Sequence, residues 1–149
     1  MADFVFNIAL GRVAYYASLP AANDALVLVA LESAGLEADS VLRDKDSLTD
    51  IVAGATNEQT TVGRKTLTSV TATVDDTLDR VAVDAADVSW ATPSGAAVGA
   101  LVVCYDPDTT GGTDADLIPL TKHTFPWSPG DGIPLNLAIA DLYRSNSTT

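Results

Sequence analysis

Short apolar runs separated by turn residues dominate the chain, a pattern typical of β-strands. Residues 25–31 (ALVLVAL) and 100–105 (ALVVCY) are continuous apolar stretches rich in β-branched side chains, so each predicts a buried strand. Residues 117–120 become apolar again after an intervening loop, and residues 64–73 alternate with threonine, as in a strand with one exposed face. We therefore expect a central hairpin of residues 100–105 and 117–120, with the remaining strands around it.

Three further segments predict strands away from this hairpin. Residues 4–9 alternate large apolar side chains with smaller ones. Residues 80–91 also alternate, and the adjacent alanines at 85–86 break the phase, which indicates a bulge. Residues 135–143 predict a last strand or a short helix, and the polar residues 144–149 predict a frayed or docking tail.

Proline punctuates the segment that follows the central hairpin. The four prolines are Pro119, Pro126, Pro129 and Pro134. Because proline lacks the N–H that a strand donates to its neighbour, this density excludes a central strand. The segment is expected to be an edge strand or an arm that lies on a neighbouring molecule.

Two short helices are predicted in the N-terminal half. Residues 11–19 place apolar side chains three and four positions apart, and Pro20 ends that helix. Residues 47–54 begin with Ser47, and Asp50 stands three positions later, which resembles a capping box. This second helix is expected to lie across an edge or an end of the sheet.

These elements predict one domain over residues 1–149, because a chain of this length can bury a sufficient core by itself. The predicted fold class is mainly β, a sandwich or barrel-like antiparallel sheet with one or two short helices in the N-terminal half. An α+β arrangement is the alternative.

The charge of the chain limits its partners. Eight Lys and Arg oppose twenty Asp and Glu, which gives a formal net charge of −12. Such an excess repels phosphate backbones and anionic lipid surfaces, so neither nucleic acid nor a membrane is an expected partner. The N-terminus lacks the pattern of a signal peptide, and the apolar run of residues 25–31 is too short to cross a bilayer.

Four aspartates form the most conspicuous polar cluster. Asp106, Asp108, Asp114 and Asp116 lie in the loop of the central hairpin, where their oxygens could converge on a calcium ion. The spacing does not match the EF-hand loop. Aspartate is also common in turns because it accepts hydrogen bonds from nearby amides. We favour the turn interpretation, and expect no cofactor, with Ca²⁺ as the weaker alternative.

Cys104 and His123 are the one cysteine and the one histidine, and the single pair that suggests a thiol nucleophile. No glycine-rich elbow accompanies them. Cys104 is expected to be a small buried hydrophobic residue of the central strand. No catalytic residue is predicted, and we expect that the protein is not an enzyme.

The large aromatic residues are candidates for core positions and for an interface. Trp90 lies on an alternating segment, so it is expected in the core. Phe125 and Trp127 flank Pro126 and, with Tyr143, are the interface candidates, since aromatic residues are enriched at binding hot spots. For Phe125 and Trp127, a core position is the alternative.

Three segments together resemble a family of small virion structural proteins of tailed bacteriophages that infect actinobacteria. They are FVFNIALGRVAYYASLP, GATNEQTTVGRKTLT and LVVCYDPDTTGGTDADLIPLTKHTF, and the block CYDPDTT…TDAD is the most specific of these. Val88-Ser-Trp90 and Asp141-Leu-Tyr143-Arg144 stand where the family has a tryptophan strand and a closing strand.

The resemblance implies a non-enzymatic component of the virion, a capsid decoration or cement protein on the head exterior that is assembled in the host cytoplasm. Its implied partners are the major capsid protein and further copies of itself, as a homo-oligomer such as a trimer. A tail or neck component is the alternative, and a calcium-dependent binding module is a weaker one.

Overall fold

The computed structural model describes residues 1–146, and this part of the chain is built mainly of strands, as predicted. The strands are β1 (Phe4–Val5), β2 (Ala25–Glu32), β3 (Lys65–Thr66), β4 (Thr71–Asp75), β5 (Arg80–Asp84), β6 (Val88–Trp90), β7 (Val98–Asp106), β8 (Ile118–Trp127), β9 (Leu135–Leu137) and β10 (Tyr143–Asn146). The helices are α1 (Val13–Ser18), α2 (Asp39–Leu42) and α3 (Leu48–Val52), with 3-10 turns η1 (Asn7–Ala9) and η2 (Pro129–Asp131).

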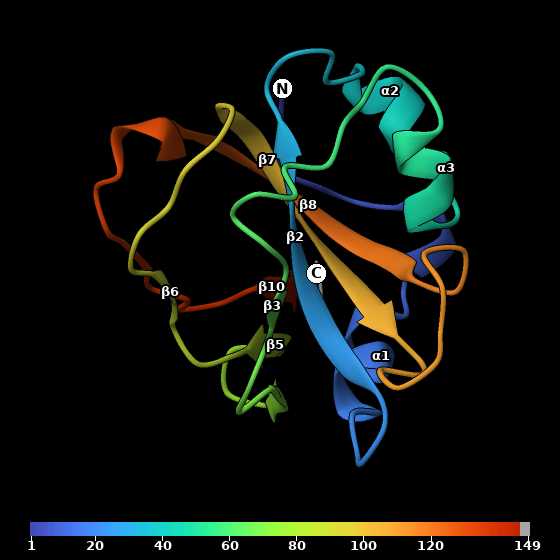
Figure 1. Ribbon diagram of the computed structural model, residues 1–149. Helices are drawn as coiled ribbons and strands as arrows, with labels where there is room; N and C mark the ends of the chain where they lie inside the picture. Colours follow the sequence, from blue (N-terminus) through green and yellow to red (C-terminus); the bar gives the residue numbers. More distant parts are fainter. Residues whose placement is uncertain (147–149) are drawn as a thin grey trace.

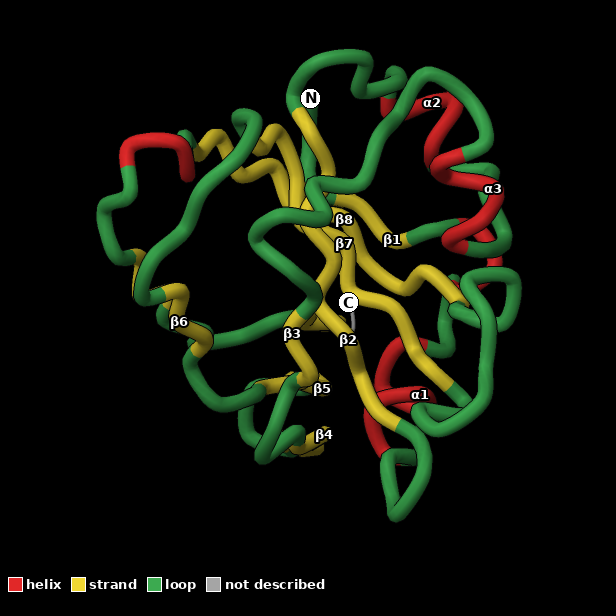
Figure 2. The backbone as a smooth tube through the Cα atoms, viewed as in Figure 1, coloured by secondary structure: helices red, strands yellow, loops and turns green. Residues whose placement is uncertain are grey.

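The largest sheet is antiparallel and has the order β1-β8-β7-β2-β3 (Figure 1). The predicted central hairpin is confirmed as β7–β8, and β2 pairs with β7 along its whole length. Two smaller antiparallel sheets have the orders β10-β5-β4 and β6-β9. Figure 2 shows the long strands β2, β7 and β8 running through the middle of the molecule, with the short strands and the helices around them.

Both faces of the central sheet are covered, which makes the architecture sandwich-like. Successive side chains of one strand point to opposite faces of the sheet, and the neighbours Leu28 and Val29 belong to two different core clusters. The cluster of Leu28 also contains Val83 of β5 and side chains of α1 and β6. The cluster of Val29 contains Leu42 of α2 and Ile51 of α3.

The expectation that the proline-rich segment cannot form a central strand is wrong for β8. It runs through Pro119 and Pro126 although β7 pairs with it on one side and β1 on the other. The β7–β8 register shifts between Val103 and Cys104, where Pro119 lies, and again between Val98 and Ala100, opposite the segment that holds Pro126. Proline is accommodated at such irregularities because no ladder hydrogen bond is required there.

Two predicted strands are each divided in the structure. Residues 64–73 give β3 and the start of β4, separated by Ser69, whose φ of 52° turns the chain. Residues 80–91 give β5 and β6, which belong to different sheets. The break at residues 85–86 therefore marks a crossing between sheets, and the predicted bulge within one strand is wrong.

Both chain ends differ from the predictions. The predicted strand of residues 4–9 ends at Val5 and continues as η1, in which Asn7 N–H bonds to the carbonyl of Arg43. Residues 135–143 form β9, an irregular strap and the start of β10, so the short-helix alternative is wrong. The predicted frayed tail is paired with β5 as far as Asn146, and residues 147–149 lie outside the described residues.

Both predicted helices are confirmed as α1 and α3, but α3 packs on a face of the central sheet, where Ile51 shares a core cluster with Val29, and not across an edge as expected. The Oγ of Ser47 accepts a hydrogen bond from the backbone N–H of Asp50 at 3.1 Å, which caps α3. Helix α2 was not predicted, because its single turn carries no periodic apolar pattern. No helix among the described residues is long and apolar enough to cross a membrane.

A buried ion pair fastens the first residues to the central sheet. The side chain of Lys122 on β8 is fully buried, and its Nζ lies 3.0 Å from the Oδ1 of Asp39 and 3.0 Å from the carbonyl of Ala2. The other oxygen of Asp39 accepts the N–H of Ala2 at 2.7 Å. The ammonium also lies 5.2 Å from the ring centroid of Phe4, within cation–π range.

Asp39→Ala is expected to lower the free energy of unfolding by about 3 kcal/mol, because it leaves a buried ammonium without its counter-charge. Urea denaturation measures the change. Replacing Lys122 by Met in the same variant should recover part of the loss, since the unpaired charge is then gone. Asp46→Ala, which removes an exposed carboxylate nearby, is the matched control. Equal effects of the two aspartate substitutions would contradict the role of the pair.

Candidate functional site

The loop between β7 and β8 holds the four predicted aspartates, and two of them organise its first turn. The Oδ1 of Asp106 accepts the N–H of Asp108 at 3.0 Å. The Oδ1 of Asp108 in turn accepts hydrogen bonds from the backbone and the hydroxyl of Thr110 and from the N–H of Gly111. Hydrogen bonds from Thr110 are the main cause that lowers the pKa of Asp108. These carboxylates replace a regular backbone ladder in the loop.

The other two aspartates close the loop. The Oδ2 of Asp116 accepts the N–H and the hydroxyl of Thr113 at 2.9 and 2.8 Å, and these bonds lower the pKa of Asp116. Asp114 receives two N–H groups of Arg64 at 2.7 and 2.9 Å, which lower its pKa. The same guanidinium binds Glu58. The loop is thereby tied to the segment that leads into β3.

In the described part of the chain, no three His, Cys, Asp or Glu side chains are grouped so that they could hold a metal ion. The four loop carboxylates face their own turns and Arg64, and the structure thus places them as elements of loop architecture. The role of Arg64 was missed at the level of sequence, since a single arginine far from the loop carries no local signal.

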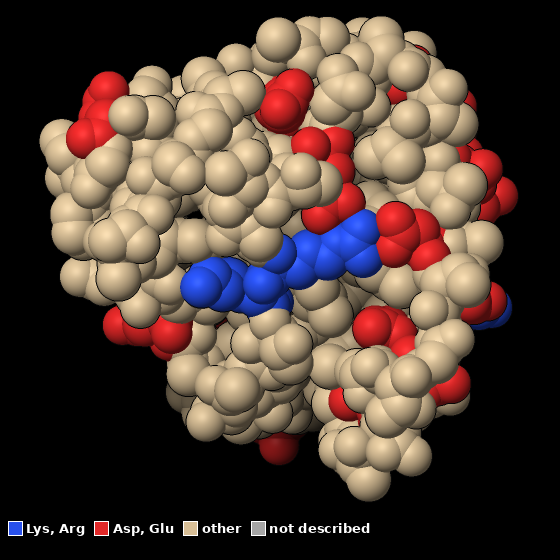
Figure 3. All heavy atoms as spheres, in the orientation of Figure 1, with Lys and Arg blue, Asp and Glu red and all other residues tan. Residues whose placement is uncertain are grey.

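Figure 3 shows one face of the surface. Acidic side chains are scattered over it, and basic side chains form one short band in the region of β3, with acidic groups beside it. Arg64, the residue that precedes β3, is bound by Glu58 and Asp114. Lys65 lies with its Nζ 5.5 Å from the ring centroid of Trp90. The two basic residues at β3 are therefore engaged within the molecule.

Cys104 and His123 lie on opposite faces of the central sheet. Cys104 belongs to the cluster under α2 and α3, whereas His123 is the register partner of Leu101, which belongs to the other cluster. Burial also raises the pKa of the Cys104 thiol far above its ordinary range. The arrangement leaves the thiol protonated and out of reach of the imidazole, so the two cannot form a nucleophile–base pair.

His123 lies at the border of the core. Its Nε2 is 2.9 Å from the Oγ1 of Thr121, and its Nδ1 is 3.6 Å from the Oδ2 of Asp3. Burial lowers the pKa of His123, and the neighbouring Asp3 opposes this effect. The imidazole is therefore neutral at pH 7, and it adds a hydrogen-bonding group to the lining of the cavity beside it.

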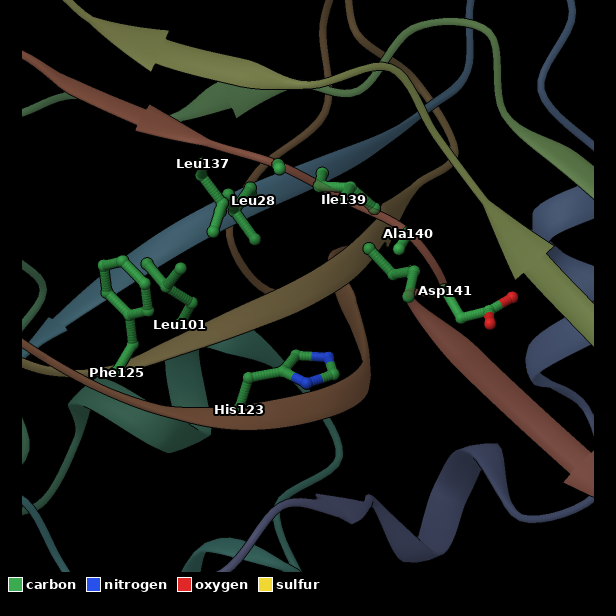
Figure 4. A pocket seen from close by; sticks show the side chains of 10 residues that line it. Leu28, Leu101, His123, Phe125, Leu137, Ile139, Ala140 and Asp141 are labelled. Carbon is green, nitrogen blue, oxygen red and sulfur yellow. The ribbon is translucent and has the colours of Figure 1, made fainter.

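That cavity has a volume of about 170 Å³ and lies between the central sheet and the strap that joins β9 to β10 (Figure 4). Leu28, Leu101, His123 and Phe125 form its floor, and residues 137–142 form the opposite wall. A second cavity of about 210 Å³ shares two lining residues with it. Because both are lined by His123 and Leu142, the two cavities adjoin, and we call them together the groove along β8. Their volumes leave room for about one or two apolar side chains.

The three aromatic interface candidates border the core. Phe125 and Trp127 are half-buried, with ring centroids 6.2 Å apart, and Trp127 lies 5.1 Å from Trp90. Trp90 is 4% exposed, which confirms its predicted core position. Tyr143 is half-buried on β10 and lines the second cavity. Of these candidates, Phe125 and Tyr143 thus lie on the groove.

The chain matches no family model, no curated protein and no solved structure.

Calcium is expected to leave the melting temperature unchanged within about 1 °C, because the four loop carboxylates already accept protein hydrogen bonds. A site with a Kd near 10 μM would be saturated a hundredfold at 1 mM CaCl₂ and would add about 2.7 kcal/mol. That corresponds to a rise of about 5 °C or more for a chain of this length. Thermal unfolding in CaCl₂ and in EDTA measures whether the melting temperature changes. A rise of this size in CaCl₂ would establish a cation site.

Proposed function

We propose that this protein is a non-enzymatic structural protein of a bacteriophage virion, a decoration or cement protein on the exterior of the head. The observation that carries the proposal is the placement of the three segments that resemble the phage family. They form β1 to α1, the approach to β3, and the β7–β8 hairpin. The first and third pair through β1 and β8, and the second binds the third through Arg64 and Asp114. The resemblance therefore covers residues that hold one another in the fold.

The use of the reactive side chains supports a structural role. The loop aspartates, Cys104 and Lys122 all lie in turns, in the core or in a buried ion pair. The net charge of −12 disfavours contact with packaged DNA. A head-stabilising protein instead needs surfaces that add buried interface to its neighbours.

We assign docking on the major capsid protein to the groove along β8. Its apolar floor and its volume suit a leucine, methionine or phenylalanine side chain. Asp3 lies at the groove with an exposed carboxylate, whereas Asp141 is paired there with Arg144 of the same chain, and the chain as a whole is strongly acidic. The complementary partner segment is therefore an apolar side chain flanked by Lys or Arg.

Purified virions of the encoding phage are expected to contain this protein in hundreds of copies, because a decoration protein covers a shell of many repeated subunits. Gel densitometry against the major capsid protein measures the number. A number in the tens or below would favour the tail or neck alternative. Absence from the particle would overturn the virion proposal altogether.

Ala140→Phe is expected to fill the groove and reduce binding to capsids by about tenfold or more, equivalent to about 1.4 kcal/mol. Because Ala140 is exposed on the strap, the melting temperature of the variant should stay close to that of the parent protein. Ala22→Phe places the same side chain on an exposed turn elsewhere and serves as the control. Sedimentation of the protein with capsids that lack it gives the binding. Unchanged binding of Ala140→Phe would remove the groove from the interface.

A further inference from the structure

β4 is an open edge of the sheet β10-β5-β4. Its first four side chains are exposed, and Val74 is 69% exposed. Helix α1 contacts the β4–β5 hairpin but leaves these side chains in solvent. Within the described residues, no hydrogen bond joins the backbone of Ala72 or Val74 to a group outside the hairpin. Figure 2 shows β4 on the outside of the molecule, far from α2 and α3.

The backbone groups of β4 that have no partner strand belong to Ala72 and Val74. The carbonyl of Val83 on β5 accepts the N–H of Leu142, so the backbone of Val83 faces β10. Ala72 is the register partner of Val83 on the other side. Because the backbone of Val83 faces β10, the pair of Ala72 and Val83 is a non-hydrogen-bonded one, and the N–H and C=O of Ala72 point away from β5. The same holds for Val74, two positions further on, since backbone groups of every second residue point to the same side of a strand. The same groups of Thr73 point inward.

We propose that a second copy of this chain pairs with β4 along this edge, antiparallel and about a two-fold axis at Thr73. In this register Ala72 of each copy faces Val74 of the partner subunit. Both residues present free N–H and C=O groups, so the pairing forms four backbone hydrogen bonds between the copies. The two Thr73 side chains meet at the centre as a non-hydrogen-bonded pair.

The charges at the edge fit a second copy in this register. Asp75 of one copy stands beside Thr71 of the partner subunit, whose hydroxyl can donate to it. The two Asp75 carboxylates are four positions apart, about 14 Å, which exceeds the screening length at physiological salt. Each is also 3.4 Å from Arg80 of its own chain. Like charges therefore do not meet across the pairing.

β4 lacks lysine and proline, two of the features by which natural proteins protect an edge. The two threonines and the valine of its sequence, TATVD, favour strand pairing. The inference concerns the isolated chain and goes beyond the proposed function: self-association through β4 stands or falls independently of whether the protein decorates a capsid.

Disulfide trapping tests the register. Thr73→Cys should form a covalent dimer in oxidised glutathione at least about tenfold faster than Thr71→Cys, because paired thiols have an effective concentration in the millimolar range. Cα atoms of a non-hydrogen-bonded pair are about 4.5 Å apart, within disulfide range, whereas the two Thr71 positions are about 14 Å apart. Cys104 is fully buried and does not compete. Equal rates for the two variants would overturn the register.

Sedimentation velocity tests the pairing without oxidation. The parent chain should show a concentration-dependent dimer, strengthened by added NaCl because the chains are both acidic. Ala72→Pro removes an outward N–H, and with it half of the interchain hydrogen bonds, while no bond within the hairpin is lost. It should sediment as a folded monomer. A monomeric parent at about 100 μM, or an Ala72→Pro variant that is folded and still dimeric, would overturn the proposal.

Discussion

The apolar character of both faces of β2 and β7 is the constraint on which this structure depends. Neither face can remain in water, so each must be covered by elements that come from elsewhere in the chain. One face receives α2, α3 and Phe6, and the other receives α1 and the strands of the smaller sheets. The chain therefore crosses repeatedly from one side of the sheet to the other. The segments between the long strands consist mostly of irregular loops with short strands and helices in them.

Polar side chains in this protein mainly replace missing backbone structure. Asp106, Asp108 and Asp116 satisfy amides in the β7–β8 loop, and Asp114 ties that loop to Arg64. Lys122 supports the N-terminal segment in the same way. Among the described residues, the groove along β8 and the open edge of β4 are the two surfaces for which we propose partners. A partner there would meet apolar side chains and backbone groups, which are the contacts that assembly interfaces use.

Some elements of this fold could be predicted from the residues that lie next to one another in the sequence. The strands β2 and β7 followed from continuous apolar runs, α1 from its spacing, and α3 from its cap at Ser47. The turn interpretation also follows from local chemistry for Asp106, Asp108 and Asp116, because each of these carboxylates binds amides two or three residues away. For these parts the amino-acid sequence alone was sufficient, since the pattern that predicts each of them lies within a few residues.

The remaining features depend on contacts between distant residues. Pro119 and Pro126 fit inside β8 only because the β7 register shifts beside them, and Lys122 is buried only because Asp39 lies opposite it. Cys104 and His123 lie on the paired strands β7 and β8, yet the register of the pairing places their side chains on opposite faces of the sheet. The sequence by itself determined the long strands β2 and β7, the helices α1 and α3, and the local turns of the β7–β8 loop. Tertiary structure alone decided which strand each segment joins and which face each side chain reaches, because register is set by long-range packing.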